Sequence, residues 1–272
     1  MASSTTVPAE NGHRRPLQGR VALVTGGGRG IGRAISLQLG GAGAAVAVNY
    51  ARDATAAEHT VAELTAAGSV AIAVQASVDD PSQNEEMVAR VSAELGAVSI
   101  LVNNGGIASR GRPVTDTPVE EFERLLRVHA IGPAVLCRLI LPAMRAQGRG
   151  DIVMMSSAAT HVLMANGAPY NMAKAALEAL AWTLAKEETS HGIHVNIVAP
   201  GLVASEMGDR LAKAVTRGRV SQADELDATS PFGHVCRPEE VADLVSFLVS
   251  DRAGYLTGQR IIIDGGASPH RA

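Results

Sequence analysis

Cysteine is scarce in this sequence of 272 residues, where Cys137 and Cys236 are the only two. They lie far apart and lack the close spacing of a zinc-binding motif, so they predict no metal site. Such sparing use is typical of proteins kept reduced inside the cell. The sequence therefore predicts a protein of the reducing, cytoplasmic compartment.

A strong excess of charge is also missing, because the formal net charge is -3 and the isoelectric point is near 6.2. Without a basic surface field, nucleic acid is not an expected partner. No apolar run approaches the roughly 20 residues that span a bilayer. Residues 1–19 are polar and lack the apolar segment of a signal peptide. We therefore expect no membrane partner, and we interpret residues 1–19 as a flexible arm.

Apolar residues make up 46% of the chain, enough for one large core in a single domain. Short β-branched runs alternate with stretches of helical period, an order typical of parallel sheets covered on both faces. The predicted strands lie at residues 21–25, 44–50, 70–74, 99–103, 151–156, 193–199 and 259–264. The sequence thus predicts an α/β domain at residues 20–266, with a doubly wound, seven-stranded parallel sheet, and a tail at 267–272.

The first predicted strand runs into a glycine-rich turn, TGGGRGIG at residues 25–32. Helical periodicity begins near Ile31, so the turn joins a buried strand to a helix N-terminus. Such a turn exposes bare N–H groups and the positive end of the helix dipole, which suit a pyrophosphate. A tight turn that binds nothing would also use glycines, but the flanking strand and helix favour a dinucleotide site in a Rossmann fold.

A second group of reactive residues lies between Ser157 and Lys174. Tyr170 and Lys174 are four residues apart on a predicted helix, so their side chains share one face. Lowering the pKa of a tyrosine by about three units costs about 4 kcal/mol, and a lysine ammonium about 4 Å away supplies a similar amount. Ser157 follows a predicted strand, where its hydroxyl could hold a carbonyl oxygen. Alone, such a pair would more often be an exposed Tyr and Lys on a surface helix.

Five motifs along the chain resemble those of the short-chain dehydrogenase/reductase family. They are TGGGRGIG at 25–32, NNGG at 103–106, Ser157 with Tyr170-x-x-x-Lys174, APG at 199–201 and YLTGQRIIIDGG at 255–266. Their order and spacing follow the family from about Arg20 to Gly266, and the pattern is most similar to that of 3-oxoacyl-carrier-protein reductases. The resemblance therefore implies a Rossmann-fold oxidoreductase.

The resemblance also implies a role for each reactive side chain. Tyr170 would give a proton to the substrate oxygen as hydride leaves the reduced nicotinamide, and Ser157 would orient that oxygen. Lys174 would lower the pKa of the tyrosine and hold the nicotinamide ribose. The implied activity is NADPH-dependent reduction of a small-molecule carbonyl, such as a medium-sized ketone or a 3-oxoacyl thioester. Sugar, steroid and polyketide ketones stay open, as do an NAD-dependent dehydrogenase and a nucleotide-binding module without activity.

One departure from the family pattern is His129, which stands where relatives have a catalytic asparagine. The helix predicted around it opens with Thr117 as N-cap, Pro118 in its first position and Glu120 completing a capping box. Apolar residues at helical spacing place His129 on the buried face. As a catalytic candidate it could hold a relay water or pass protons to Lys174, and it could also be a hydrogen-bonded core histidine.

The second predicted strand ends in VAVNYARD, which bears on the choice between NAD and NADP. NAD-binding folds place an acid at this strand end for the ribose hydroxyls, whereas NADP needs a cation for its phosphate. Here Tyr50 fills the expected acid position, and Arg52 and Arg29 are nearby cations. NADP(H) is therefore the preferred prediction, while Asp53 keeps NAD(H) as an alternative. A second departure is Ser77, where relatives have an aspartate that contacts adenine.

Further cofactor contacts are implied by the resemblance. The predicted cofactor-binding residues are Gly26, Gly28, Arg29, Gly30, Ile31, Gly32, Tyr50, Arg52, Asn103, Gly105, Tyr170, Lys174, Pro200, Gly201 and Ser205. Ser205 would contact the nicotinamide amide, and it would also suit the N-cap of the following helix. His191 and His194 do not share a helical face and have no third ligand nearby in sequence, so no metal is expected.

Two expectations concern the substrate pocket and the assembly. Residues 202–233 mix charged and small apolar residues and are predicted to form a helical lid over the site. The candidate pocket residues are His161, Leu163, Met164 and Asn166. By resemblance we expect a homotetramer, paired through the long helices that carry His129 and Tyr170 and again near the closing strand.

Overall fold

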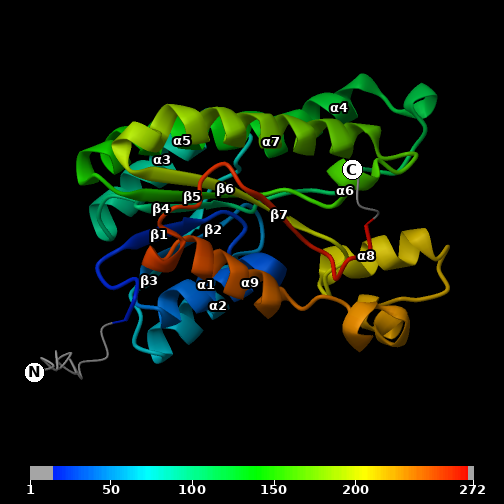
Figure 1. Cartoon of the computed structure of the whole chain (residues 1–272), viewed down its shortest axis with the longest axis horizontal. Coiled ribbons are helices and arrows are strands. Elements are labelled where there is room, and N and C mark those ends of the chain that lie inside the picture. Colours follow the sequence, from blue (N-terminus) through cyan, green and yellow to red (C-terminus); the bar gives the residue numbers. More distant parts are fainter. Residues whose placement is uncertain (1–14, 269–272) are drawn as a thin grey trace, which may run out of the picture.

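A parallel sheet of seven strands forms the centre of the protein, in a computed structural model that describes residues 15–268 (Figure 1). Its strands are β1 (Val21–Val24), β2 (Ala45–Tyr50), β3 (Ala71–Gln75), β4 (Ile100–Asn103), β5 (Gly150–Met155), β6 (Ile193–Pro200) and β7 (Arg260–Ile263). Their order is β3-β2-β1-β4-β5-β6-β7, and each adjacent pair is parallel. The predicted doubly wound Rossmann fold is confirmed, with each strand placed within one residue at either end.

Burial on both faces explains why the strand sequences are apolar. Every residue of β1 and of β5 is buried. Figure 1 shows two helical layers: α1 (Gly30–Gly41), α2 (Ala54–Ala66) and α9 (Pro238–Leu248) on one face, and α3 (Pro81–Glu94), α5 (Gly132–Gln147) and α7 (Ala168–Glu188) on the other. Because neither face of a central strand meets water, each position favours an apolar residue.

The reversal of strand order beside β1 is the feature that positions the site. β1 pairs with β2 on one side and with β4 on the other, so the chain winds away in opposite directions from this point. A crevice at the carboxyl ends of such strands is where doubly wound folds bind ligands. The glycine turn follows β1, the NNGG segment begins at the last residue of β4, and Ser157 comes shortly after β5. The motifs found in the sequence therefore gather at one edge of the sheet.

A long helix crosses one face of the sheet. Helix α4 (Val119–Leu126), a π-helical turn (Arg127–Ile131) and α5 form one continuous segment. By length and composition alone this helix, Val119–Gln147, is apolar enough to cross a membrane, which differs from the expectation that no such run exists. Half of its most apolar window is buried inside the protein.

The start of this helix differs from the prediction. Its N-cap is Pro118, no side-chain cap hydrogen bond is made, and the first helical residue is Val119. The hydroxyl of Thr117 instead donates to the carbonyl oxygen of Pro113 at 2.8 Å, closing the preceding 3-10 turn (Val114–Asp116). The predictions of Thr117 as N-cap and of a capping box with Glu120 are therefore wrong, because the hydroxyl is already committed to that turn.

The packed core begins before the predicted domain boundary at residue 20. Leu17 is 1% exposed, and its N–H donates to the carbonyl oxygen of Ala42 at 2.9 Å. It belongs to the core on the α1 face of the sheet. The rest of the predicted arm, residues 1–14, and the end of the predicted tail, residues 269–272, lie outside the described residues.

The predicted lid segment is helical, as expected. It contains α8 (Glu206–Val215) and 3-10 turns at Ala223–Thr229 and Pro231–Gly233. Ala212, Ala223 and Val235 form a small core of its own. Shorter elements elsewhere are α6 (Ala159–Val162) and 3-10 turns at Thr189–His191 and Asp251–Ala253. The lid segment lies beside the carboxyl end of the sheet (Figure 1).

Candidate active site

The glycine turn after β1 is shaped by packing within the chain. Gly26 and Gly30 have φ angles of 61° and 52°, a region that favours glycine. A Cβ at Gly32 would lie 2.1 Å from the carbonyl oxygen of Gly26, and one at Gly28 would lie 2.9 Å from Ala57 of α2. Internal packing therefore requires several of these glycines whether or not a ligand binds.

The N-terminus of α1 lies at this turn. The helix begins at Gly30, one residue before the predicted start at Ile31, and its N-cap, Arg29, makes no side-chain cap hydrogen bond. By contrast, Asp53, Asp80 and Ser205 cap α2, α3 and α8 with their own oxygens. The first N–H groups of α1 thus lack a side-chain acceptor from the N-cap, an arrangement that suits an anion.

Three buried polar side chains that the sequence analysis missed hold the turn in place. Asn49 in β2 accepts the N–H of Gly26 through Oδ1 at 3.2 Å. Ser36 of α1 and Thr60 of α2 donate to carbonyl oxygens of the turn at 3.0 and 3.1 Å. A polar residue inside an otherwise apolar strand was the signal that could have identified Asn49.

Ser157, Tyr170 and Lys174 come together beyond the carboxyl end of β5. The side chain of Ser157 lies close enough to Tyr170 to lower the pKa of the phenol, and Nζ of Lys174 lies 5.7 Å from the centroid of the Tyr170 ring. Lys174 is buried and donates to the carbonyl oxygen of Met155 at 2.6 Å. The structure thus places the three side chains in one cluster, on the helix face expected from the spacing of four.

Burial governs the protonation of this cluster. Desolvation raises the pKa of Tyr170 to about 12, and the hydrogen bond with Ser157 offsets only part of that shift. Desolvation also lowers the pKa of Lys174 to about 8, against the opposing effect of Glu178. The expected lowering of the Tyr170 pKa by Lys174 is therefore wrong for the protein alone, because burial disfavours the charged form of both groups.

His129 lies against Tyr170, with ring centroids 5.3 Å apart. The imidazole is 2% exposed, and its Nε2 is 2.8 Å from the carbonyl oxygen of Ile107. Within residues 15–268, its Nδ1 has no hydrogen-bond partner. Burial, and secondarily the charge of Lys174, lowers the pKa of His129 to about 3. The predicted burial is confirmed, and the group is a neutral imidazole in a π-helical turn, a feature frequent at functional sites.

The NNGG segment supports the glycine turn through its second asparagine. Asn103 is buried, and its Nδ2 lies 3.3 Å from Sδ of Met154, so this side chain faces the core. Asn104 donates to the carbonyl oxygen of Thr25 at 2.9 Å, and the N–H of Gly105 donates to the hydroxyl of Thr25 at 2.8 Å. A cofactor contact by Asn103 stays a prediction, with its side chain turned to the core, and Asn104 is a supporting residue that the sequence analysis missed.

The candidate determinants of cofactor choice surround the glycine turn. Arg29 pairs with Glu206 of α8 at 3.0 Å, and both side chains are more than half exposed. Tyr50 is half-buried at the end of β2, and Arg52 after it is exposed. Asp53, the alternative ribose ligand, accepts a backbone N–H of α2 at 3.1 Å as its N-cap.

The loop after β6 meets the glycine turn. Ser205 accepts the N–H of Gly208 at 3.2 Å, which confirms its expected N-cap role. A Cβ at Gly30 would lie 3.5 Å from the Cβ of Ser205. Pro200 ends β6, and a Cβ at Gly201 would lie 2.8 Å from Asp264. The lid helix α8 therefore begins directly beside the N-terminus of α1.

The remaining histidines and cysteines have other surroundings. Nδ1 of His194 lies 3.3 Å from Asp151, and its Nε2 contacts the carbonyl oxygen of Gly254 at 3.2 Å. In the described part of the chain, no group of three or more His, Cys, Asp or Glu could hold a metal ion. Cys137 is buried in the core, and burial raises the pKa of its thiol to about 12.

Known proteins resemble this chain over nearly its whole length. A family model described as enoyl-(acyl carrier protein) reductase matches residues 26–268. Versicolorin reductase 1 of Aspergillus parasiticus is 39% identical over 260 residues, which cover 92% of this chain and 97% of that protein. A chloroplastic NADPH-dependent aldehyde reductase-like protein of Arabidopsis thaliana is 37% identical over 263 residues, 92% and 95% of the two chains. A 3-oxoacyl-[acyl-carrier-protein] reductase of Synechocystis is 35% identical over 251 residues, 92% and 97%.

Solved structures agree with the sequence relatives. A short-chain type dehydrogenase/reductase from Mycobacterium marinum superposes with a TM-score of 0.83 at 33% identity, covering 93% of this chain and 97% of that one. Levodione reductase gives a TM-score of 0.85 at 29% identity, covering 92% and 98%. The chain belongs to the short-chain dehydrogenase/reductase family. It is an oxidoreductase of that family, whose members bind NAD(H) or NADP(H), act on small molecules and are commonly oligomeric.

Proposed function

We propose that this protein is an NADPH-dependent carbonyl reductase that reduces a ketone or a 3-oxoacyl thioester. The observation that carries the proposal is the cluster of Ser157, Tyr170 and Lys174, in which Nζ of Lys174 lies 5.7 Å from the centroid of the Tyr170 ring. These side chains supply the proton donor, the oxygen-binding group and the cation that carbonyl reduction needs. The reductase names of three relatives support the same reaction class.

The residues around the glycine turn fit a dinucleotide. The N-terminus of α1 has no side-chain cap from Arg29, and the backbone there carries glycines. Gly28, Gly30 and Ile31 are proposed to hold the pyrophosphate. Lys174 is proposed to hold the nicotinamide ribose. The nicotinamide itself would contact Pro200, Gly201 and Ser205. When bound, the reduced nicotinamide supplies the hydride that adds to the carbonyl carbon.

Tyr170 supplies the proton in the proposed reaction. Because its pKa is raised to about 12, the phenol stays protonated at neutral pH, as a proton donor must. Its proton passes from Oη to the substrate oxygen, and Ser157 donates a hydrogen bond to that same oxygen. Lys174, held by the carbonyl of Met155, stabilises the phenolate that remains.

The substrate proposal is tested by a panel of carbonyl compounds. We expect loss of NADPH absorbance with ketones and 3-oxoacyl thioester analogues, whereas sugars and simple alcohols with NADP⁺ should react poorly. Leu163, Met164 and Asn166 are exposed near the start of α7 and are proposed to line the pocket with the half-buried His161. NADPH binding without turnover on any carbonyl would instead indicate a nucleotide-binding module.

NADPH is the proposed cofactor because the end of β2 lacks an acid. Tyr50 stands in that position, and the carboxylate of Asp53 is engaged as the N-cap of α2. The exposed cations Arg29 and Arg52 suit a ribose phosphate. The KM values for the two cofactors test the choice, and a preference of about tenfold for NADH, close to 1.4 kcal/mol, would favour the alternative.

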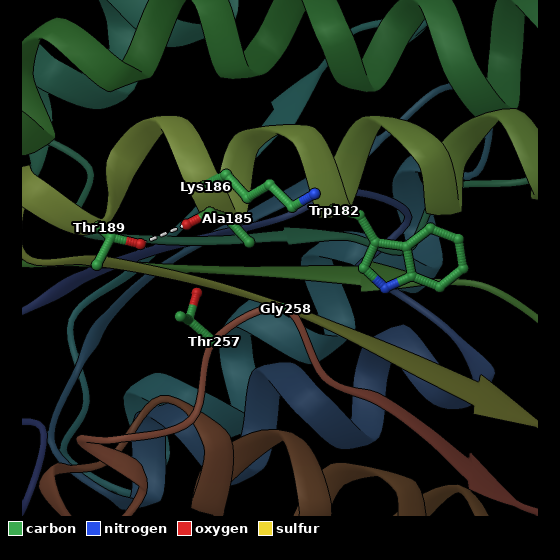
Figure 2. Close-up of a pocket in the computed structure, with 6 residues that line it drawn as sticks. All are labelled: Trp182, Ala185, Lys186, Thr189, Thr257 and Gly258. Atoms are coloured by element: carbon green, nitrogen blue, oxygen red, sulfur yellow. Dashed lines mark hydrogen bonds between the residues drawn. The ribbon is translucent and has the colours of Figure 1, made fainter.

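Assembly into a homotetramer is also proposed. All four residues of the edge strand β7 are only half-buried, and Trp182 on α7 is 41% exposed. Beside Trp182 lies an open hollow of about 520 Å³, shown in Figure 2 and lined by Trp182, Ala185, Lys186, Thr189, Thr257 and Gly258. Partly apolar surface of this kind favours contact between copies. Light scattering tests the proposal, and a monomer mass would contradict it.

Placement in the cytoplasm stays a prediction, which cell fractionation can check.

A further inference from the structure

A buried carboxylate lies one helical turn beyond Lys174. Glu178 is on α7, and its side chain is 7% exposed. Its Oε1 accepts hydrogen bonds from the hydroxyls of Ser156 and Thr160 at 2.5 and 2.8 Å. It also accepts one from Nε of Arg260 at 2.9 Å. None of these contacts is part of the reaction described above.

The donors to Glu178 surround the segment that carries Ser157. Ser156 directly precedes Ser157, and Thr160 follows it in α6. Arg260 also donates to the hydroxyl of Thr160 at 2.6 Å, which closes a ring of hydrogen bonds around the carboxylate. Because charge-assisted hydrogen bonds are short and directional, this ring fixes the segment against α7. The buried hydrogen bonds of Glu178 therefore tie the segment that carries Ser157 to the helix that carries Tyr170.

Two cations neighbour the carboxylate, Arg260 at 2.9 Å and Lys174 four residues earlier on the helix. Lys174 is on its own helix, and Arg260 comes from β7. Burial lowers the pKa of Lys174 to about 8, and the negative charge of Glu178 acts in the opposite direction. His129 and Tyr170 lie near Lys174, and both are neutral at neutral pH, because their pKa values are about 3 and about 12. Glu178 is thus the anion that opposes the loss of the ammonium proton.

We propose that Glu178 is a positioning residue of the active site, a role that rests on the proposed reductase function. It holds Ser157 in register with Tyr170 by tying the serine segment to α7. It also supplies the charge that keeps Lys174 an ammonium while the phenolate forms. A carboxylate with a merely structural role would stabilise the fold without either effect.

Titration of Lys174 tests the electrostatic part without any substrate. Lys174, Lys186 and Lys213 are the only lysines in the sequence, so carbon-13-labelled lysine gives few signals. Lys186 and Lys213 are exposed and serve as internal references. We expect Glu178→Gln to lower the pKa of Lys174 by about one unit or more, since a neighbouring opposite charge, here four residues along the same helix, typically has that effect. An unchanged Lys174 titration would overturn this part, whether or not the protein proves to be a reductase.

Kinetics test the positioning part, with Glu188→Gln as the matched control. Glu188 lies on the same helix, is 1% exposed and is held by Arg145 at 2.5 and 2.8 Å. Glu178→Gln should lower kcat about tenfold at neutral pH, leave the KM for NADPH nearly unchanged and move the alkaline loss of activity to lower pH. Glu188→Gln should lower the melting temperature but keep the pH profile. Equal losses of kcat in both variants would show that Glu178 acts only through stability.

A second variant separates the hydrogen bonding of Glu178 to the serine segment, the tether, from the effect of its charge on Lys174. Glu178→Asp keeps the anion but shortens its reach to Ser156 and Thr160. We expect a Lys174 pKa close to that of the wild type together with a kcat lowered about threefold or more. An Asp variant with wild-type kcat would overturn the tether. If the wild-type protein turns over no carbonyl compound, the proposed function fails, and the lysine titration still decides the charge effect.

Discussion

The rings of His129 and Tyr170 meet at 81°, with their centroids 5.3 Å apart. A neutral imidazole therefore lies beside the proposed proton donor. Because burial lowers the pKa of His129 to about 3, forming an imidazolium at neutral pH would cost about 5 kcal/mol at about 1.4 kcal/mol per unit. This cost disfavours proton transfer through a charged His129. We therefore expect His129 to act as a fixed hydrogen-bonding group.

Substitution of His129 tests that expectation. His129→Asn keeps a polar side chain, so kcat should stay within about threefold and the pH profile should keep its shape. His129→Leu removes the polar atoms and should lower kcat about tenfold. Profiles of kcat across the neutral range check both variants. Full activity in the Leu variant would show that His129 contributes only to packing of the core.

Removal of the phenol hydroxyl should abolish most of the chemistry. Tyr170→Phe keeps the ring against His129 but lacks the proton, so kcat should fall about 100-fold to 10,000-fold. NADPH fluorescence should show that binding persists. Tyr255→Phe is the matched control, because Tyr255 is fully exposed and should tolerate the change. Near-normal turnover by Tyr170→Phe is the result that the proposed mechanism does not allow.

Arg29 should contribute to the discrimination between cofactors. Its ion pair with Glu206 is exposed on both sides and is worth less than about 1 kcal/mol, so the guanidinium can exchange partners. Arg29→Ala should raise the KM for NADPH about tenfold and leave that for NADH nearly unchanged. Glu206→Gln removes the pair but keeps the cation, so its KM for NADPH should not rise. Parallel losses with both cofactors would exclude Arg29 as a phosphate ligand.

Two glycines of the same helix should respond oppositely to alanine. A Cβ at Gly32 would lie 2.1 Å from a backbone oxygen, whereas one at Gly41 has nothing within 4 Å. Gly32→Ala should destabilise the protein by about 1–3 kcal/mol or more through overpacking. Gly41→Ala should be neutral or stabilising by up to about 1 kcal/mol. Urea unfolding measures both, and similar midpoints for the two variants would contradict the packing of the turn.

His194 should make stability depend on pH. The hydrogen bond with Asp151 raises the pKa of His194 above its ordinary value. The stabilisation is thus fully present below the unfolded pKa of about 6.5 and is lost as pH rises through the folded pKa. His194→Asn should therefore lower the melting temperature more at about pH 5.5 than at about pH 9. His191→Asn, at an exposed position, is the control. An equal effect of His194→Asn at both values would argue against a charged pair.

Periodicity and motif spacing predicted much of the fold and of the catalytic cluster. The strands were placed within one residue because burial on both faces demands continuous apolar runs, as in VALV of β1. Tyr170 and Lys174 share a side of α7 because four residues are close to one helical turn. Both features depend only on local backbone geometry, so the spacing of residues in the sequence is enough to predict them.

Properties that depend on tertiary packing could not be predicted in this way. The pKa of Tyr170 rises instead of falling because burial outweighs the lowering effect of Ser157. Asn103, not its neighbour, ends β4 and faces the core, and a shift of one residue at a strand end reverses the direction of a side chain. The π-helical turn at His129 arises where α4 and α5 join, just before Pro133, whose missing N–H is a local signal that the sequence analysis did not use. Glu178 escaped notice because its partners are distant in sequence.

Both edge strands of the sheet are short: β3 has five residues and β7 has four. A foreign strand that added at either margin would gain few main-chain hydrogen bonds, too few to repay its loss of conformational freedom. Brevity at the borders is therefore a safeguard against runaway strand addition and fibre growth. It lets a wide parallel sheet keep uncapped edges without open-ended strand addition between molecules.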